Sequence, residues 1–314
     1  MNFGVLFAGQ GSQKTGIGLD FMSDPLFKET IEMASEASGE EIEAIFKNDE
    51  NQLAKTVYLQ PALVAMEAGI YRMLMRDLPD IRIGGMVGLS LGEYGAMYAS
   101  GALDLADTIS LVSDRAAYMQ EDADKIDNAM AALIKPDVEK IESILQKMQD
   151  DGQRIYLANY NSPKQVVIAG VKDDVLAATE EIKDQAAAKR AIMLKVNGAF
   201  HTPLFNSARE KMHERLASVE FSESKIPVIS NTTVKPFTND WAEIMEKQLA
   251  VPTHFGDCLS YLIKNMKIDA TLEIGPGKTL TSFANQVDSN LENWRIGSLQ
   301  EYQEFIEAKN GLKG

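Results

Sequence analysis

A strand-to-helix turn built around one serine constrains this chain more than any other feature of its sequence. Residues 88–92 read Gly-Leu-Ser-Leu-Gly and fit the pattern G-x-S-x-G. In this pattern the serine occupies a strained turn, and the glycines leave room where side chains would collide. Residues 83–87 are apolar, as at the end of a buried strand, and residues 93–100 contain good helix formers. The pattern therefore predicts a strand, a turn that exposes Ser90, and a helix.

The predicted turn would also direct backbone amides at the serine. The first N–H groups of a helix have no partner inside it, and they lie at the positive end of the helix dipole. An oxyanion that forms on an acyl group at Ser90 would then meet the amide of Leu91. This interpretation makes Ser90 a nucleophile. The alternative is an ordinary tight turn, because G-x-S-x-G also occurs by chance.

Composition sets wide limits on the protein class. The 314 residues are 45% hydrophobic and 25% charged, which is typical of a soluble globular chain with one large and one smaller domain. Cys258 is the only cysteine and there are three histidines, so we expect no disulfide framework, no zinc centre and a reducing, cytoplasmic location. We expect no signal peptide, because the first residues lack a basic region, and no apolar run reaches transmembrane length. The net charge of −15 argues against nucleic acid as the main partner.

A second unit interrupts the chain between residues 127 and 197. Its expected elements are a strand at 130–134, a helix at 138–148, strands at 155–159 and 165–169, a helix at 175–188 and a strand at 192–196. This β-α-β-β-α-β order is typical of ferredoxin-like units. We therefore predict a discontinuous catalytic domain, residues 1–126 and 198–314, with a ferredoxin-like subdomain inserted at 127–197.

The remaining elements are expected at both ends of the larger domain. They are strands at 3–7, 226–230 and 271–274, a helix at 62–76 that begins with Pro61, and a frayed helix after residue 300. The glycine-rich loops after residues 7 and 274 look like phosphate-binding loops. They fail that test, because Lys14 and Leu272 stand where a required glycine belongs.

Arg115 lies on the apolar stripe of a helix expected at 105–119, beside Leu111, Val112 and Met119. A guanidinium does not lose its charge in a protein, so on this stripe it needs a carboxylate or phosphate partner. Two partners would meet this need: a buried acidic residue of the same chain, or the anionic group of a ligand.

A serine nucleophile needs a base, and three histidines are candidates. His213 lies on a charged helix face, and His254 follows Pro252 in a segment that we expect to be structural. His201 lies in a loop that opens a helix and follows the serine along the chain, as in α/β-hydrolases. We predict that His201 is the base, the alternative being a capping or packing histidine.

The third group, which would orient the base, has no marker in the sequence. Asp257 and Asp269 are candidates without a motif. A carbonyl group would also serve, because the third group only has to accept a hydrogen bond.

Six short motifs occur in one order along nearly the whole chain. They are FAGQGSQ at 7–13, GLSLGEY at 88–94, Arg115 with MQE at 119–121, NSP at 161–163 with VIAG at 167–170, AFHTP at 199–203 and EIGPG at 273–277. In this combination the chain resembles bacterial malonyl-CoA:acyl carrier protein transacylases and the acyltransferase domains of polyketide synthases. The resemblance implies an α/β-hydrolase-like core with a ferredoxin-like insert, the organisation predicted above.

The resemblance also implies catalytic roles. Ser90 would accept a malonyl group from malonyl-CoA and pass it to the phosphopantetheine thiol of acyl carrier protein in fatty-acid biosynthesis. His201 would act as base and then as acid, and the backbone carbonyl of Gln248 would orient it. The amides of Gln10 and Leu91 would form the oxyanion hole. No metal or other cofactor is implied, and the protein is expected to be a monomer.

Three further residues are implied as substrate-binding. Arg115 lies 25 residues after Ser90, as in the family, and would hold the free malonyl carboxylate. Asn161 and Phe200 would line the same site, with the bulk of Phe200 excluding a 2-methyl group. The chain departs from the family at one position, because Leu89 stands where the family usually has histidine before the serine.

Three other functions share some of these features. A stand-alone polyketide acyltransferase would use the same motifs and differ in the carrier that it serves. A serine thioesterase or other hydrolase would give the acyl group to water, against which Arg115 and the insert argue. A non-catalytic module would only bind the carrier protein. Lys189 and Arg190, a basic pair beside the insert, are a hypothesis for the carrier-docking surface.

Overall fold

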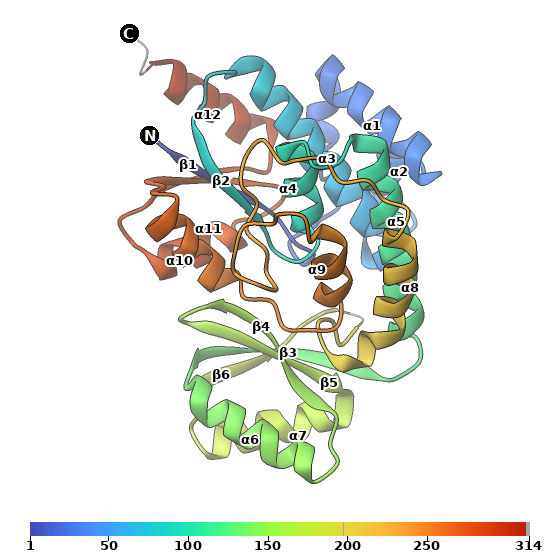
Figure 1. Cartoon of the computed structure of the whole chain (residues 1–314), viewed down its shortest axis with the longest axis vertical. Helices are drawn as coiled ribbons and strands as arrows, with labels where there is room; N and C mark the ends of the chain where they lie inside the picture. The colour runs from blue at the N-terminus through green and yellow to red at the C-terminus, as the bar shows by residue number, and fades with distance from the viewer. Residues whose placement is uncertain (197, 312–314) are drawn as a thin grey trace.

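Two four-stranded sheets organise residues 1–196 and 198–311, which the computed structural model describes (Figure 1). The first sheet is parallel, with the strand order β2-β1-β7-β8. Its strands are β1 (Phe3–Phe7), β2 (Ile83–Gly88), β7 (Ala270–Ile274) and β8 (Glu292–Ile296). The second sheet is antiparallel, with the order β4-β5-β3-β6. The prediction of a mixed α/β chain is therefore confirmed.

Helices cover both faces of the parallel sheet, which explains why all of β1 is buried. Side chains alternate between the faces of a strand, so Val5 and Phe7 enter one core cluster and Leu6 enters another. Helices α1 to α5 contribute to the first cluster, and α10 and α11 to the second. These helices are α1 (Pro25–Ser38), α2 (Ile42–Lys47), α3 (Thr56–Asp77), α4 (Gly92–Ser100), α5 (Leu105–Ala123), α10 (Phe255–Asn265) and α11 (Thr279–Val287).

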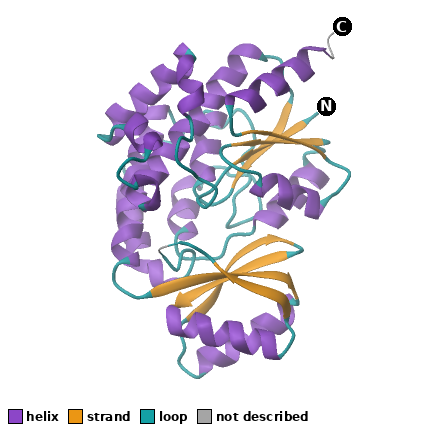
Figure 2. Cartoon of the chain, turned by 180° about the vertical axis from the view of Figure 1, so that it is seen from behind, coloured by secondary structure: helices purple, strands orange, loops and turns teal. Residues whose placement is uncertain are grey.

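The antiparallel sheet has two helices on its outer face and turns its other face toward the parallel-sheet unit (Figure 2). The unit runs β3 (Asn128–Pro136), α6 (Val138–Asp150), β4 (Ile155–Ser162), β5 (Gln165–Val171), α7 (Lys172–Asp184) and β6 (Ala188–Met193), the predicted order. Along β3, Ala131 and Leu133 pack with α6 and α7, whereas Met130 and Ala132 join the core cluster of the other unit. The inner face of this sheet is therefore part of the main core. Asn197, the predicted end of the insert, lies outside the described residues.

The remaining elements connect or cover these units. They are the 3₁₀ turns η1 (Leu19–Ser23), η2 (Gln52–Ala54) and η3 (Pro203–Phe205), and the helices α8 (Asn206–Leu216), α9 (Trp241–Gln248) and α12 (Leu299–Asn310). Within the described residues, no helix combines the length and the apolar character needed to cross a membrane.

The segment 226–230, which we expected to be a strand, does not form a continuous ladder of backbone hydrogen bonds with the sheet. The segment touches β2 through a single isolated bridge between Met86 and Val228. It exchanges two backbone hydrogen bonds with Met86, one to the Pro227 carbonyl and one from the Ile229 amide. Pro227 has no N–H to donate, and the chain turns back at Ser230, whose amide bonds to Lys235. The segment therefore extends the sheet edge without forming a regular strand.

Several element boundaries also differ from the sequence prediction. Helix α3 begins at Thr56 instead of Pro61, so the proline lies inside the helix. It removes a single N–H donor there, and burial of the surrounding face outweighs this loss. Helix α7 ends at Asp184, because Ala186 takes a left-handed backbone conformation, and β6 then begins at Ala188. The strand predicted at 192–196 therefore lies earlier, at Ala188–Met193, because its exposed basic residues Lys189 and Arg190 do not show apolar alternation.

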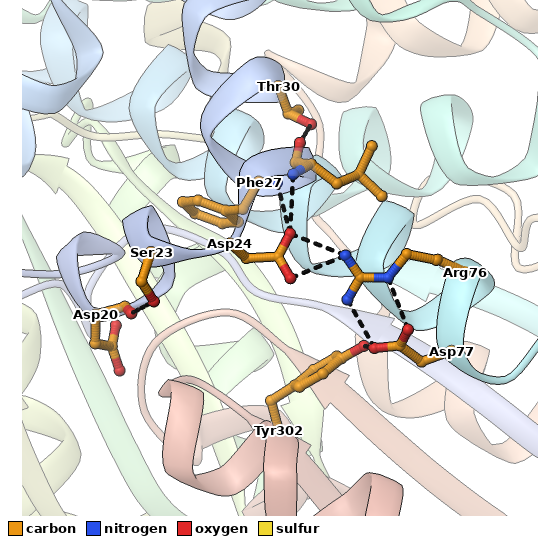
Figure 3. A network of polar contacts seen from close by, with 9 residues as sticks. Asp20, Ser23, Asp24, Phe27, Thr30, Arg76, Asp77 and Tyr302 are labelled. Carbon is orange, nitrogen blue, oxygen red and sulfur yellow. Dashed lines mark hydrogen bonds and ion pairs between the residues drawn. The ribbon is translucent and has the colours of Figure 1, made fainter.

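Helix α12 packs against the core, so the prediction of a frayed helix after residue 300 is wrong for the residues up to 310. Tyr302 and Phe305 of α12 are buried, and Phe305 packs edge-on against the rings of Phe3 and Trp294. A polar network in Figure 3 adds to this packing: the Tyr302 hydroxyl donates to Asp77 at 2.6 Å. The prediction failed because the polar residues of α12 outnumber these two apolar anchors.

We predict that replacing Phe305 with alanine lowers the free energy of unfolding by about 3–5 kcal/mol, the usual cost of removing a buried aromatic side chain. Urea denaturation of the whole chain would measure this change. The exposed Glu304, replaced with alanine in the same helix, is the control and should change stability by less than about 0.5 kcal/mol. Equal effects of the two substitutions would mean that α12 does not pack as described.

Candidate active site

Ser90 lies at the tip of a tight turn between β2 and α4, with a backbone φ of 53°. Close backbone contacts require both flanking glycines. A Cβ atom on Gly88 would lie 1.8 Å from the backbone of Gly92, and one on Gly92 would lie 2.1 Å from the carbonyl oxygen of Phe7. No side chain fits at either place unless β1 or α4 moves. The strand, turn and helix predicted from G-x-S-x-G are therefore confirmed.

Asn231 holds this turn from the neighbouring segment, and the sequence analysis missed it. Its side-chain oxygen accepts a hydrogen bond from the Ser90 amide at 2.8 Å. Its side-chain nitrogen donates to the Gly88 carbonyl at 2.8 Å. The two bonds stabilise the strained backbone on both sides of the turn. The only signal in the sequence was a single asparagine after an apolar run, which is not specific.

His201 meets Ser90 although 111 residues separate them. Ser90 Oγ lies 2.7 Å from His201 Nε2, and His201 Nδ1 lies 2.8 Å from the backbone carbonyl oxygen of Gln248. A carbonyl oxygen only accepts hydrogen bonds, so Nδ1 carries the proton and Nε2 is left to accept from the serine hydroxyl. In this arrangement a histidine can remove the proton of a nucleophile.

Burial is the main reason why the pKa of His201 falls from 6.5 to about 4. The bond to the Gln248 carbonyl opposes this shift, and the positive charge of Arg115 adds to it. A histidine with a lowered pKa is neutral, and therefore able to accept a proton, at any pH well above 4. His201 can thus act as a base across the physiological range.

The other two histidines lie away from this site. His213 is exposed and contacts Glu246, and His254 stacks on Tyr160 with its ring also 3.4 Å from Asp257. Asp269, the other acidic candidate for orienting the base, accepts from the Asn2 amide. The described residues also contain no group of three His, Cys, Asp or Glu side chains that could hold a metal ion.

Arg115 projects from α5 into the same site and is 1% exposed. It donates to Gln60 Oε1 at 2.8 Å, to Gln248 Oε1 at 3.1 Å and to Ser90 Oγ at 3.1 Å. Its Nε has no partner, and no carboxylate of the described residues forms a salt bridge with the guanidinium. The internal ion pair that the sequence left open is therefore not found. Neutral amides position Arg115 and leave its charge available to an anion.

Two residues that line the same space have backbone amides without an acceptor among the described residues. Gln10 lies in the loop after β1, and Leu91 precedes α4. Within the described chain, neither amide donates a hydrogen bond, and both residues line the cavity at Ser90. Two free N–H groups beside a nucleophile are the usual donors to a tetrahedral oxyanion.

A cavity of about 550 Å³ connects these groups and lies between the two sheets. The parallel-sheet unit contributes Ser90, Arg115 and His201, and the antiparallel sheet contributes residues of β3, β4 and β5. This volume is in the range of sites that hold a small organic ligand. The chemistry therefore comes from one unit, and part of the wall comes from the other.

The remaining predicted residues also line this cavity. Asn161 donates to Gln165 at 3.0 Å and keeps a buried oxygen without a partner. Phe200 packs on Phe205 with ring centres 5.3 Å apart. Leu89 lies on the wall next to the nucleophile, so the position of the family's usual histidine is apolar here.

Residues 5–296 match the family model described as acyl transferase domain. The chain is 35% identical over 310 residues to the malonyl CoA-acyl carrier protein transacylase of Bacillus subtilis, with 96% of each chain covered. It is also similar to the transacylase of Escherichia coli K12, at 35% identity over 92% of this chain and 94% of that protein.

Solved structures agree with these relatives. The crystal structure of MCAT from Streptococcus pneumoniae has a TM-score of 0.92 and 38% identity, covering 98% of this chain and 100% of that one. A malonyl-transacylase in complex with its type II PKS acyl-carrier protein also has a TM-score of 0.92, at 31% identity, with 98% and 100% covered.

We predict that a fluorophosphonate probe labels Ser90 in the wild-type protein. Replacing His201 with alanine should slow labelling by about 10²- to 10⁴-fold, because the serine loses its base. Replacing the exposed His213 with alanine is the matched control and should leave the rate unchanged. Peptide mass spectrometry would identify the labelled residue. Equal rates in the two histidine variants would contradict the assignment of His201.

We also predict the pH dependence of this labelling. Because the pKa of His201 is lowered to about 4, the base form is lost only as the pH falls through that value. The labelling rate should therefore contain a rise between about pH 3 and pH 5 that disappears when His201 is replaced with alanine. A His201-dependent midpoint near 6.5 in place of this low-pH rise would show that His201 titrates like an exposed histidine.

Proposed function

The chain belongs to the acyl transferase family, and on that basis we propose that it moves a malonyl group from malonyl-CoA to the phosphopantetheine thiol of an acyl carrier protein. Relatives named malonyl CoA-acyl carrier protein transacylase are similar to this chain over 92–96% of its length. The observation that carries the proposal is the meeting of Ser90, His201 and Arg115 in one buried cavity. This set supplies a nucleophile, a base and a fixed positive charge.

In the first half-reaction, Ser90 Oγ attacks the thioester carbonyl of malonyl-CoA while its proton passes to His201 Nε2. The carbonyl oxygen becomes an oxyanion that the amides of Gln10 and Leu91 can bind. When the carbon–sulfur bond breaks, the proton on His201 passes to the departing CoA thiol. The malonyl group is then an ester of Ser90. Losing one oxyanion donor should cost about 3–4 kcal/mol of transition-state stabilisation.

In the second half-reaction, the carrier thiol takes the place of CoA. His201 removes the thiol proton, the sulfur attacks the Ser90 ester, and the proton returns to Ser90 Oγ as the ester bond breaks. A thioester is consumed and a thioester is formed, so the reaction needs no metal or redox cofactor. A covalent intermediate allows two thiols to use one site in turn.

Arg115 would give the site a preference for a malonyl group. Its guanidinium can bind the free carboxylate of the substrate through two hydrogen bonds. An acetyl group has no such carboxylate and would leave the buried charge without a partner. A missing partner of this kind discriminates far more strongly than the space occupied by one methyl group, for which Phe200 would be the selecting residue.

The domain organisation belongs to the same proposal. The parallel sheet with its helices, residues 1–126 and 198–314, is proposed as an α/β-hydrolase-like catalytic domain. The antiparallel unit, residues 127–197, is proposed as a ferredoxin-like insertion, which its strand order β4-β5-β3-β6 supports. The monomeric state and the cytoplasmic location remain predictions. Lys189 and Arg190 lie exposed on β6 and remain the hypothesis for carrier docking.

A brief mix with malonyl-CoA followed by intact-protein mass spectrometry tests the proposal. The wild-type protein should gain one malonyl group, and Ser90→Ala should gain none. Arg115→Ala should lose its preference for malonyl-CoA over acetyl-CoA, because nothing then binds the carboxylate. If only acetyl-CoA gave an adduct, the assignment of Ser90 as nucleophile would stand and the assignment of malonyl-CoA as the donor would be wrong.

The alternatives predict different second steps. Adding a phosphopantetheinylated carrier protein should remove the malonyl group from Ser90 and place it on the carrier. A thioesterase would release malonate to water at the same rate without the carrier. A polyketide acyltransferase would prefer a polyketide carrier to a fatty-acid carrier, and the ratio of the two rates separates these functions.

A further inference from the structure

Glu93 is a buried carboxylate beside the site that no step above uses. It follows Gly92 in the first turn of α4 and is 0% exposed. Its Oε1 accepts a hydrogen bond from the backbone N–H of Asn231 at 2.5 Å, and its Oε2 accepts one from the side-chain nitrogen of Gln248. Burial raises the pKa of Glu93 to about 7, and both hydrogen bonds and the charge of Arg115 favour its ionised form.

Both donors to Glu93 also hold the reacting groups. Asn231 binds the Ser90 amide and the Gly88 carbonyl through its side chain. Gln248 offers its backbone carbonyl to His201, and its side-chain oxygen accepts from Arg115. Its side-chain nitrogen also donates to the Ser90 carbonyl at 3.0 Å. Asn231 therefore connects Glu93 to the nucleophile Ser90. Gln248 connects Glu93 to the base His201 and to the cation Arg115.

We propose that Glu93 is a positioning residue that sets Ser90 through Asn231 and Arg115 through Gln248. A carboxylate has two oxygens and accepts from both neighbours at once. It thereby fixes which way the Gln248 amide points, with the nitrogen toward Glu93 and the oxygen toward Arg115. The part of the inference that concerns malonyl selectivity rests on the proposed function, and the part that concerns Ser90 does not.

Glu93→Gln tests this role with almost no change in size. The new glutamine side chain has one oxygen and one nitrogen in place of two oxygens. Its NH₂ group, a donor, would therefore face a second donor, either the backbone N–H of Asn231 or the side-chain nitrogen of Gln248. If the Gln248 amide turned over to remove this conflict, its nitrogen would face the Arg115 guanidinium, donor against donor. Arg115 would lose the acceptor that holds it in place.

The experiment measures single-turnover acylation by malonyl-CoA and acetyl-CoA, with active sites counted by fluorophosphonate labelling. We expect the malonyl-to-acetyl ratio of Glu93→Gln to fall by about 10- to 100-fold, as for loss of one hydrogen bond to a charged group. This ratio does not depend on how much protein is folded, so a purely structural defect would not move it. Glu246→Gln, a buried carboxylate on α9 that contacts His213 and Arg209, is the matched control and should keep the wild-type ratio.

Gln248→Met provides a second variant that keeps the backbone carbonyl for His201. It should lower the same ratio, and the double variant with Glu93→Gln should be no worse than the lower single one, because both changes act on one connection. A wild-type ratio in Glu93→Gln, or losses that multiply in the double variant, would overturn the Gln248 branch.

The fluorophosphonate rate at Ser90 tests the other branch without any acyl-CoA. Glu93→Gln should label more slowly than wild type and Glu246→Gln, and an unchanged rate would overturn the positioning of Ser90. If the wild-type protein takes no malonyl group from malonyl-CoA, the proposed function fails, and this labelling rate alone decides whether Glu93 positions the nucleophile.

Discussion

The site depends on holding one residue in an unfavourable backbone conformation. A left-handed serine costs on the order of 1–3 kcal/mol, and the surrounding structure must supply that energy. At this turn the backbone of Gly92 lies against the Phe7 carbonyl of β1, and Asn231 binds the peptide groups on both sides of Ser90. Three segments far apart in the sequence therefore converge on one turn. Backbone contacts place the nucleophile, while its own side chain stays free to react.

Arg115 carries the positive charge of the site. Arg115 is buried, and burial lowers its pKa, yet a guanidinium keeps its proton in proteins. Among the described residues no carboxylate forms a salt bridge with it; the amides of Gln60 and Gln248 hold it, and the charge of Glu93 acts on it without direct contact. The same charge helps to keep His201 neutral. The cation thus acts on the base, and in the proposed function it would also bind an anion.

Sequence patterns predicted the parts of the molecule that depend on local chemistry. The glycines around Ser90 have a steric reason that G-x-S-x-G states directly, and the order of elements from β3 to β6 followed from alternating apolar runs. Gln60 and Asn231 were missed because each is a single amide whose role exists only after distant elements pack together. The prediction of a strand at 226–230 was wrong because Pro227 interrupts the backbone pairing. The prediction that α12 is frayed was wrong because two buried aromatic residues anchor this otherwise polar helix. The orienting group of His201 is a backbone carbonyl, which no residue type reveals; the resemblance to the acyltransferases indicated Gln248.

The cavity has walls of two origins, since its reactive groups come from the parallel-sheet unit and its opposite wall from β3, β4 and β5. Residues such as Met130 and Ala132 shape that wall without contacting Ser90 or His201 through any hydrogen bond. Substitutions in β3, β4 and β5 can therefore alter this wall, and with it the space for the acyl group, while the reaction machinery of the parallel-sheet unit is conserved. The shape of this wall is thus separable from the chemistry, whereas Arg115 and Phe200 tie the proposed malonyl selectivity to the catalytic unit.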